Sequence, residues 1–252
     1  MFKTGLVSVT FRQLEPAAII DLCRQAVLDG IEWGGDIHVP HGDLDRARAV
    51  GRLTRAAGLA IPSYGSYYRA GVSEPEGLAF PPVLATAVAL QAANIRIWAG
   101  KLGSGQADEN LWQQVIEDTK RVCGLAGRAG LTVSFEYHDG TLTDTPETAL
   151  RLAKAVDCAN LRLYWQPAVG LTAAARLAGL QLVQPWLSHC HVFHWSGQDR
   201  LPLADGRAEW RQYLDQMRTD QNLHYCLLEF VRNSDPDQFL ADGAILRELL
   251  AE

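Results

Sequence analysis

The 252-residue sequence lacks several features that mark particular classes of protein. It has no run of 18 or more apolar residues, so we predict no membrane-spanning helix. The opening stretch MFKTGLVSVTF lacks the long apolar segment and small-residue cleavage site of a signal peptide. Lysine and arginine (23) are outnumbered by aspartate and glutamate (29), which gives a formal net charge of −6. Because a nucleic-acid surface needs a basic face, we expect neither nucleic acid nor a membrane as a partner.

The five cysteines form no CxxC pair that would indicate a zinc or redox motif. An odd, dispersed set of cysteines indicates reduced thiols that act as small buried hydrophobic residues. We therefore predict a cytoplasmic location. Apolar residues make up 48% of the chain, enough for a sizeable core, and charged residues make up 21%.

Strand-like and helix-like segments alternate along the whole chain. The predicted strands are residues 6–11, 31–35, 59–68, 95–100, 132–138, 161–167, 189–195 and 225–230. The predicted helices are residues 16–29, 44–58, 81–93, 109–130, a segment that begins near 146, and residues 172–180, 208–218 and 236–252.

Eight strand–helix units in a chain of this length predict an α/β fold, a (β/α)8 TIM barrel, as a single domain over residues 1–252. The alternative is an open doubly wound sheet, which favours a G-x-G-x-x-G loop after the first strand. The segment SVTFRQLEP at that place has no such loop, and no Ser/Gly/Pro-rich linker divides the chain.

In a (β/α)8 barrel the active site lies at the C-terminal ends of the strands. The fifth, sixth and eighth predicted strands end with Glu136, Gln166 and Glu229. Alternation of side chains places Glu136 and Glu229 on the inner faces of their strands. The seventh strand contains three histidines, His189, His191 and His194. Two carboxylates, an imidazole and an amide oxygen predict a site for one divalent ion such as Mn, Mg, Co or Zn.

A divalent ion at this place would explain how carboxylates are tolerated there, because an unpaired buried charge is expensive. The ion would polarise the carbonyl and the adjacent hydroxyl of a bound sugar. A glutamate could then remove the proton from the carbon between them and leave an enediolate. Glu136 and Glu229 are therefore the predicted catalytic residues. The alternative is that both are buried ion-pair partners, for instance of Arg96 or Lys101.

Several segments together resemble the xylose isomerase-like superfamily of sugar-phosphate isomerases and epimerases. These segments are GIEWGGDIHVPHGDL, IPSYGSYY, FEYH, LYWQP, HVFHW and LLEFVR. The resemblance implies a TIM barrel with one divalent cation bound by strands five to eight. Matched position by position, it implies the ligands Glu136, Gln166, His191 and Glu229. Gln166 departs from the acidic residue usual at its position, and a neutral amide binds an ion less tightly than a carboxylate.

Further residues near the predicted strand ends are candidates for binding the substrate. Aromatic rings pack on the apolar faces of sugars, and lysine or arginine binds a phosphate or an acidic sugar. The predicted substrate-binding residues are Glu32, His38, Tyr64, Trp98, Lys101, His138, Trp165, His194 and Arg232. The structural alternatives are an ion pair with Arg96 for Glu32, packing at the rim for the aromatic residues, and surface ion pairs for the two cationic ones. The irregular segment 199–210 is predicted to cover the substrate.

These observations predict a metal-dependent isomerase or epimerase that acts on a small sugar or sugar phosphate through an enediolate. A dehydratase or lyase on the same barrel is the second hypothesis, with His194 or His138 as the acid for the leaving hydroxyl. A sugar-binding barrel that has lost catalysis is the third, and Gln166 is the residue that favours it. An abasic-site endonuclease would need more metal ligands and a basic surface. The predicted partner is a small carbohydrate, and a homo-oligomer is compatible with the sequence.

Overall fold

The structure, a computed structural model, describes residues 1–220 and 222–252. Eight parallel strands close into a barrel in the order β1-β10-β7-β6-β5-β4-β3-β2, which confirms the predicted (β/α)8 fold. The barrel strands are β1 (Phe2–Val7), β2 (Gly30–Gly34), β3 (Tyr64–Ala70), β4 (Asn94–Ala99), β5 (Thr132–Phe135), β6 (Leu161–Trp165), β7 (Leu187–Val192) and β10 (His224–Leu228). An antiparallel hairpin of β8 (His194–Ser196) and β9 (Asp199–Leu201) lies outside the barrel.

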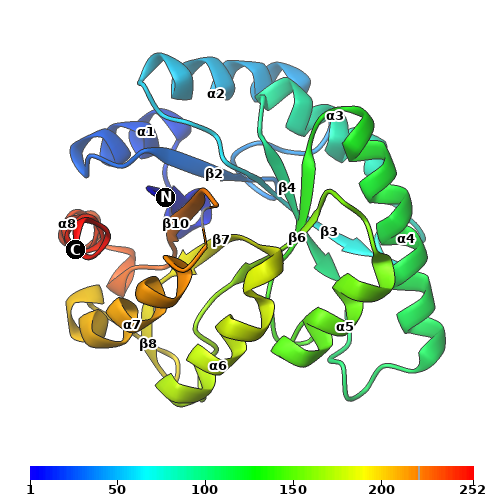
Figure 1. The fold of residues 1–252 in the computed structure, drawn as a ribbon. Coiled ribbons are helices and arrows are strands. Elements are labelled where there is room, and N and C mark those ends of the chain that lie inside the picture. Colours follow the sequence, from blue (N-terminus) through cyan, green and yellow to red (C-terminus); the bar gives the residue numbers. More distant parts are fainter. Residues whose placement is uncertain (221) are drawn as a thin grey trace.

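Helices surround the ring of strands (Figure 1). They are α1 (Pro16–Gln25), α2 (Leu44–Ala56), α3 (Phe80–Leu90), α4 (Glu109–Arg128), α5 (Pro146–Val156), α6 (Ala173–Val183), α7 (Arg207–Met217) and α8 (Pro236–Ala251). Several of them begin where an aspartate or threonine side chain accepts a hydrogen bond from the first turn. These capping residues are Asp43, Asp108, Thr145, Thr172 and Asp235.

The two faces of each strand have different environments. On β5, Val133 and Phe135 are buried in the main hydrophobic core between the barrel and the helices. Ser134 lies on the opposite face, where its hydroxyl bonds Asn94 of β4 and Ser188 of β7. This alternation confirms the predicted inward direction of the polar face of the strand, which continues to the candidate site.

Several predicted strands begin or end at other residues in the structure. The fifth, sixth and eighth, expected over 132–138, 161–167 and 225–230, end at Phe135, Trp165 and Leu228. The first was expected over 6–11, but β1 ends at Val7 and a 3-10 turn, η1, follows at Ser8–Phe11. The Ser8 hydroxyl accepts a hydrogen bond from the backbone of Gly34, so side-chain bonds replace a strand ladder there. The third was expected over 59–68, but β3 begins only at Tyr64. Pro62 has no N–H to donate to a neighbouring strand.

The seventh predicted strand is divided in the structure. Residues 187–192 form β7, and residues 194–196 begin the separate hairpin. The segment 199–210, expected as an irregular loop over the substrate, contains β9, a 3-10 turn and the start of α7. Backbone hydrogen bonds between β8 and β9 therefore give this segment a strand that its composition did not predict.

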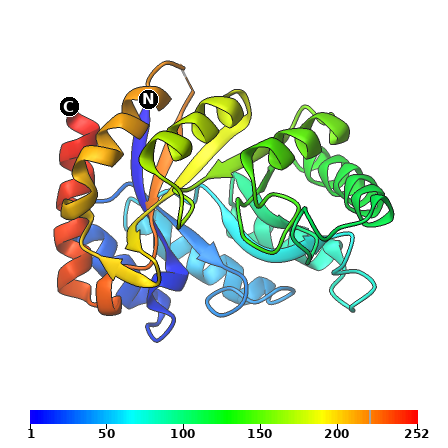
Figure 2. The same cartoon turned by 90° about the horizontal axis from the view of Figure 1, so that it is seen from below.

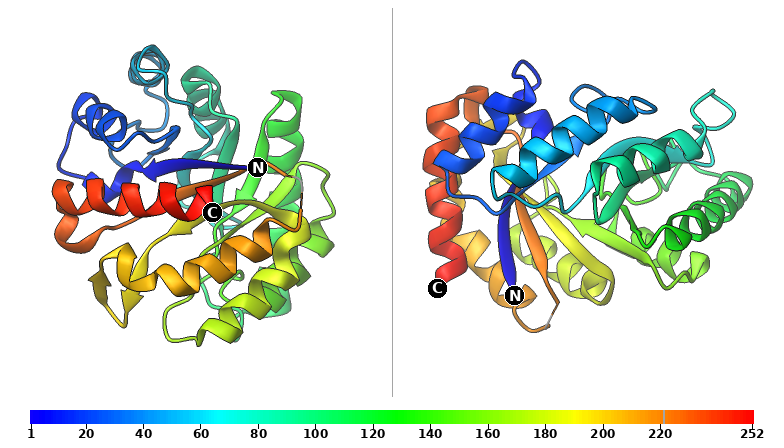
Figure 3. Two further views of the ribbon diagram at one scale, coloured as in Figure 1. Left: turned by 60° about the vertical axis from the view of Figure 1, so that its left-hand side comes forward. Right: turned by 90° about the horizontal axis from the view of Figure 1, so that it is seen from above.

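Both termini lie at the same end of the barrel, and the hairpin lies toward the other end (Figures 2 and 3). This arrangement follows from the alternation, because β1 begins at the N-terminal end of the barrel and α8 runs back toward it. Among the described helices, none is both long enough and apolar enough to cross a bilayer.

Candidate active site

A cavity of about 290 Å³ opens at the C-terminal ends of the barrel strands, where the site was predicted. Its lining residues come from β3 and β4 and from the loops that follow most of the other strands. They are Arg12, Tyr67, Arg96, Trp98, Glu136, Tyr137, His138, Asp139, Gln166, Pro167, Ala168, Val169, Phe193, Trp195, Glu229 and Phe230.

Three donor groups, from the ends of β5, β6 and β10, converge around one ring nitrogen of His191 on β7. The Nδ1 atom of His191 lies 3.0 Å from Oε1 of Gln166. It lies 3.3 Å from Oε2 of Glu229 and 3.6 Å from Oε1 of Glu136. His191 and the two glutamates are buried, and together they form a group that could hold a metal ion.

These separations fit a shared ion. Ligand atoms about 2.1 Å from a metal lie about 3.0 Å apart along an octahedral edge and about 3.4 Å apart along a tetrahedral edge. The distances from His191 Nδ1 to the other donors, 3.0, 3.3 and 3.6 Å, fall around these values. The donor set of two carboxylates, an amide oxygen and an imidazole is also one that Mn, Co or Zn accepts.

A buried ion-pair network lies directly beneath the donors. Arg96 of β4 is 1% exposed, and its Nε lies 2.7 Å from Oε1 of Glu32 on β2. Its Nη1 donates to Oε2 of Glu136, and so does the indole nitrogen of Trp98. Gly65 on β3 leaves room for the guanidinium, because a Cβ at this residue would lie 2.6 Å from Arg96 Nη2. The opposite oxygen of Glu136, Oε1, is the one that faces His191.

The charges in this network perturb one another strongly. Burial, the largest single effect, would raise the pKa of Glu32, but Arg96, His191 and the Tyr164 hydroxyl together outweigh it and lower the pKa of Glu32. Burial would likewise lower the pKa of His191, but the carboxylates of Glu229 and Glu32 raise it to about 10. Nε2 of His191 is buried and has no hydrogen-bond partner, since Glu32 Oε1 lies 3.7 Å away. Glu32 is held in place by the hydroxyl of Tyr164, which donates to its Oε2 at 2.7 Å.

The formal charge of the site also matches a divalent ion. The carboxylates of Glu32, Glu136 and Glu229 contribute −3, and Arg96 contributes +1. With a neutral His191 the sum is −2, which one divalent cation neutralises. This net negative charge favours a proton on His191 and so raises its pKa. The proton compensates only half of the charge.

The walls of the cavity are largely aromatic. The ring of His138 stacks on Trp98, with centroids 4.4 Å apart. Tyr67 and Phe230 have φ angles of 56° and 54°, values that are uncommon for non-glycine residues. Two bulky residues in this conformation in the lining of one cavity are consistent with strain at a functional site.

Five of the predicted site residues line this cavity, and a sixth, the fully buried His191, lies against three of them. Glu136, Gln166, His191 and Glu229 form the donor cluster, and Trp98 and His138 form part of the wall. Glu32 is 0% exposed and lies below the cluster, paired with Arg96.

The remaining predicted substrate-binding residues lie elsewhere in the structure. Tyr64 is fully buried and donates its hydroxyl to the carbonyl of Val39, and the buried ring of His38 bonds Ser8. Trp165 packs outside the barrel against Trp210 and Tyr213. His194 belongs to the hairpin and lines a separate small crevice. Lys101 is an exposed partner of Glu76, and Arg232 is exposed on the turn after β10.

Other residues of the site were not predicted from the sequence. Tyr164 is one of them, and alternation along LRLYWQ places it on the same inner face as Gln166. Arg12 lies on the loop after η1, where it pairs with Asp36, and no periodic signal marks this position. Phe193 follows the end of β7 and was hidden within a strand predicted to continue.

Comparison with known proteins places these features in context. A family model described as xylose isomerase-like TIM barrel matches residues 20–249. Among curated proteins, 3-dehydroshikimate dehydratase of Bacillus anthracis is 24% identical over 177 residues. The match covers 60% of this chain and spans about three fifths (61%) of the relative's length.

Solved structures with the same fold include enzymes of two kinds. The probable 3-DHS dehydratase from Bacillus anthracis has a TM-score of 0.79 at 19% identity, over 98% of this chain and 99% of the other. A 3-keto-D-glucoside 4-epimerase from E. coli has a TM-score of 0.77 at 16% identity, over all of both chains. D-psicose 3-epimerase from Clostridium cellulolyticum H10 has a TM-score of 0.74 at 15% identity, over 98% and 99%. At these identities the likeness shows a shared fold.

Proposed function

The chain belongs to the xylose isomerase-like TIM barrel family, and we propose that it is a metal-dependent isomerase or epimerase of a small carbohydrate. The observation that supports this proposal most strongly is the convergence of Glu136, Gln166, His191 and Glu229 at the floor of a cavity of sugar size. The reaction is removal of a proton from a carbon next to a carbonyl, followed by return of a proton to the resulting enediolate.

The same four residues would hold the ion. A divalent ion bound there supplies Lewis-acid polarisation of the substrate carbonyl and of its neighbouring hydroxyl. The neutral imidazole of His191 leaves its Nε2–H directed toward Glu32, 3.7 Å away, which favours the tautomer that coordinates through Nδ1.

The two glutamates have different surroundings and therefore different roles. Oε2 of Glu136 accepts from both Arg96 and Trp98, so this carboxylate is fixed and presents only Oε1 to the centre of the site. Glu229 presents Oε2 to His191, and in the described part of the chain its Oε1 has no hydrogen-bond donor. Glu229 is therefore the carboxylate free to take a proton from the substrate, and Glu136 orients and stabilises.

The cavity favours an unphosphorylated substrate. Within residues 1–220 and 222–252, its lining contains two cationic side chains, Arg12 and Arg96, and both are paired with carboxylates. The stacked rings of Trp98 and His138 offer a flat surface for the apolar face of a sugar. Free cations that could bind a phosphate are thus missing from this described lining, and hydroxyl and stacking contacts remain.

Dehydration is the second candidate function, and two observations favour it. The curated relative from Bacillus anthracis is a dehydratase. His138 also lines the cavity, where it can protonate a leaving hydroxyl, whereas His194 lies outside it. Elimination begins with the same proton removal, so the two candidates differ only in the later steps of the reaction.

A single experiment tests the proposal and separates the two candidates. The protein is incubated with Mn or Mg and a panel of ketoses and cyclic hydroxyketones in deuterated water. NMR then follows both deuterium entry at the α-carbon and loss of water from the substrate. Matched variants are Glu229→Gln at the proposed base and Glu117→Gln on the exposed face of α4, where the carboxylate only accepts from Gln113.

We expect metal-dependent deuterium entry that Glu229→Gln abolishes and Glu117→Gln leaves unchanged. If the substrate loses water and no isomerised or epimerised product forms, the result would support the dehydratase hypothesis and contradict the isomerase hypothesis. Exchange that persists in Glu229→Gln, or in the presence of a chelator, would contradict the proposed mechanism.

A further inference from the structure

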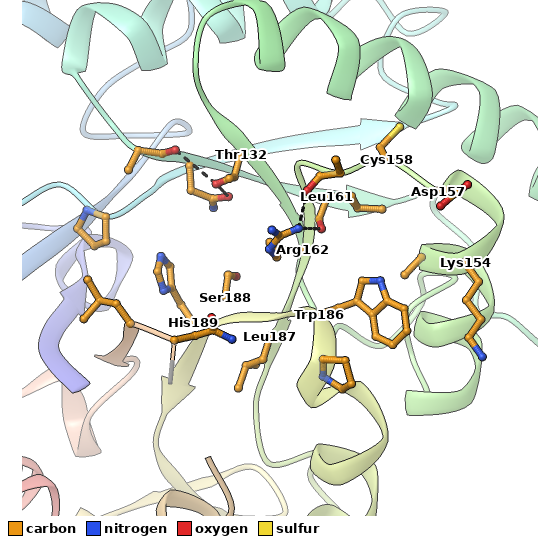
Figure 4. Close-up of a pocket in the computed structure, with 18 residues that line it drawn as sticks. Thr132, Lys154, Asp157, Cys158, Leu161, Arg162, Trp186, Leu187, Ser188 and His189 are labelled. Atoms are coloured by element: carbon orange, nitrogen blue, oxygen red, sulfur yellow. Dashed lines mark hydrogen bonds between the residues drawn. The ribbon is translucent and has the colours of Figure 1, made fainter. Parts of the chain in front are cut away.

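A second and larger cavity, of about 960 Å³, lies at the opposite end of the barrel (Figure 4). It is bounded by the first residues of β4, β5, β6 and β7 and by the loop before β10. Its lining and that of the candidate active site have no residue in common.

The cavity extends to an interior layer of polar side chains. Asn94, Thr132, Ser134 and Ser188 bond one another across three strands. Branched aliphatic residues usually fill the inside of such barrels. A polar layer open to a cavity is therefore suited to a polar ligand or to water.

Arg162 of β6 projects into this cavity without a counter-charge. It pairs in register with Ser134, so its side chain lies on the inner face of the barrel. Its Nη1 donates to the carbonyls of Ala159 and Leu161, whereas Nε and Nη2 make no hydrogen bond in the described part of the chain.

Comparison with the other inward-facing arginine makes this feature informative. Arg96 lies between two carboxylates, those of Glu32 and Glu136. No carboxylate among residues 1–220 and 222–252 lies within ion-pair distance of Arg162, although the residue is half-buried. A partly desolvated guanidinium with two free donor groups is a ready partner for a carboxylate or a phosphate.

We propose that this cavity is a binding site for a small organic anion. Nε and Nη2 of Arg162 bind its oxyanion, and the indole of Trp186 packs against its apolar body. Lys154 at the rim adds a second positive charge, and Asp157 at the end of the same helix adds one negative charge. The charged groups of the lining therefore sum to +1, which favours a ligand with one or two negative charges.

The test measures binding of aromatic probes by ligand-observed NMR titration at constant ionic strength. Benzoate and phenyl phosphate distinguish a carboxylate from a phosphate, and benzyl alcohol is the neutral analogue. The central variant is Arg162→Gln, which removes the charge. Arg52→Gln is the matched control, because Arg52 is exposed on α2 and changes the net charge equally.

We expect one of the two anions to saturate the wild-type protein and benzyl alcohol to bind more weakly. Arg162→Gln should weaken the anion at least about tenfold, as loss of a charged hydrogen bond does, and Arg52→Gln should leave it unchanged. The proposal is overturned if neither anion saturates the protein by about 10 mM, or if both arginine variants bind alike.

Two exposed rim variants decide the question if Arg162→Gln does not fold. Lys154→Gln should lower the affinity for the anion, and Asp157→Asn should raise it. Asn tolerates the left-handed conformation of Asp157, whose φ is 49°, so the second change leaves the backbone intact. Equal affinities in these two variants would overturn the proposal.

Discussion

Arg96 is the residue whose replacement should damage the protein most. Methionine at this position fills much of the volume but removes the cation between Glu32 and Glu136. Glu32 is 0% exposed and would keep only the Tyr164 hydroxyl and, 3.7 Å away, the ring of His191 as described neighbours. Removal of one partner from a buried ion pair destabilises by about 3–5 kcal/mol. Total stabilities of about 5–15 kcal/mol make this loss a large fraction of the whole.

Urea unfolding in the presence of a chelator measures the effect without any contribution from bound ions. We expect Arg96→Met to lower the free energy of unfolding by about 3–5 kcal/mol, or the Tm by about 2–4 °C for each kcal/mol. Arg48→Met is the matched control. Its ion pair with Asp45 is exposed, so it should change stability by less than about 1 kcal/mol.

A double variant tests whether the loss comes from stranded charge. Glu32→Gln in the Arg96→Met background removes one of the two carboxylates left without a cation. The double variant should therefore be more stable than Arg96→Met alone, by at least about 1 kcal/mol. The reasoning fails if Arg96→Met is within about 1 kcal/mol of the wild type, or if the second substitution destabilises it further.

Three further predictions concern the ion, the N-terminal strand and the core. Excess Mn should raise the free energy of unfolding by about 2.7 kcal/mol at 100 times Kd, and His191→Ala should abolish this increment; an equal increment in that variant would contradict the assigned ligand. Hydrogen bonds from Thr4 and Lys3 outweigh partial burial and lower the pKa of Asp29. Asp29→Asn should therefore be less stable than the wild type at pH 7. The difference should begin to shrink at about pH 3.9, the unfolded value, and vanish only below the lowered pKa of the folded protein; a constant difference in acid unfolding curves would refute this assignment. Tyr64→Phe should lower the free energy of unfolding by about 1 kcal/mol and leave turnover unchanged, because the hydroxyl of Tyr64 bonds the Val39 carbonyl in the core. Lost turnover at unchanged stability would instead support the contact with substrate that the sequence predicted.

The fold could be predicted because strand and helix periods alternate eight times, whereas several boundaries depend on interactions between distant segments. Side-chain bonds of Ser8 to Gly34 end β1 early, and Pro62 delays β3. The hairpin of β8 and β9 forms through pairing of two segments that are too short to show a period. Such features depend on partners that only the folded chain brings together.

The cluster of Glu136, Gln166, His191 and Glu229 could be predicted from positions at strand ends, which the barrel brings to one rim, and its binding of an ion stays a prediction. The pairing of Arg96 with both Glu32 and Glu136 could be seen only in the structure. From the sequence, a metal ion and an arginine were alternative partners for Glu136. The structure shows that one carboxylate can serve both, since Arg96 meets Oε2 while Oε1 faces the donor cluster. Alternation along β6 could have separated Tyr164, inside the barrel, from Trp165 outside it.

Gln166 and Arg96 are best understood together. With a neutral His191 and the amide of Gln166, the charged groups of the site sum to −2, which a divalent ion balances. A carboxylate at position 166 would bring the sum to −3 in a buried site, where excess charge is poorly screened. The amide therefore fits a site that already contains a third carboxylate, Glu32, beneath its ligands. Under the proposed function, Gln166 is therefore a suitable ligand rather than a sign of lost catalysis, and its oxygen lies 3.0 Å from His191.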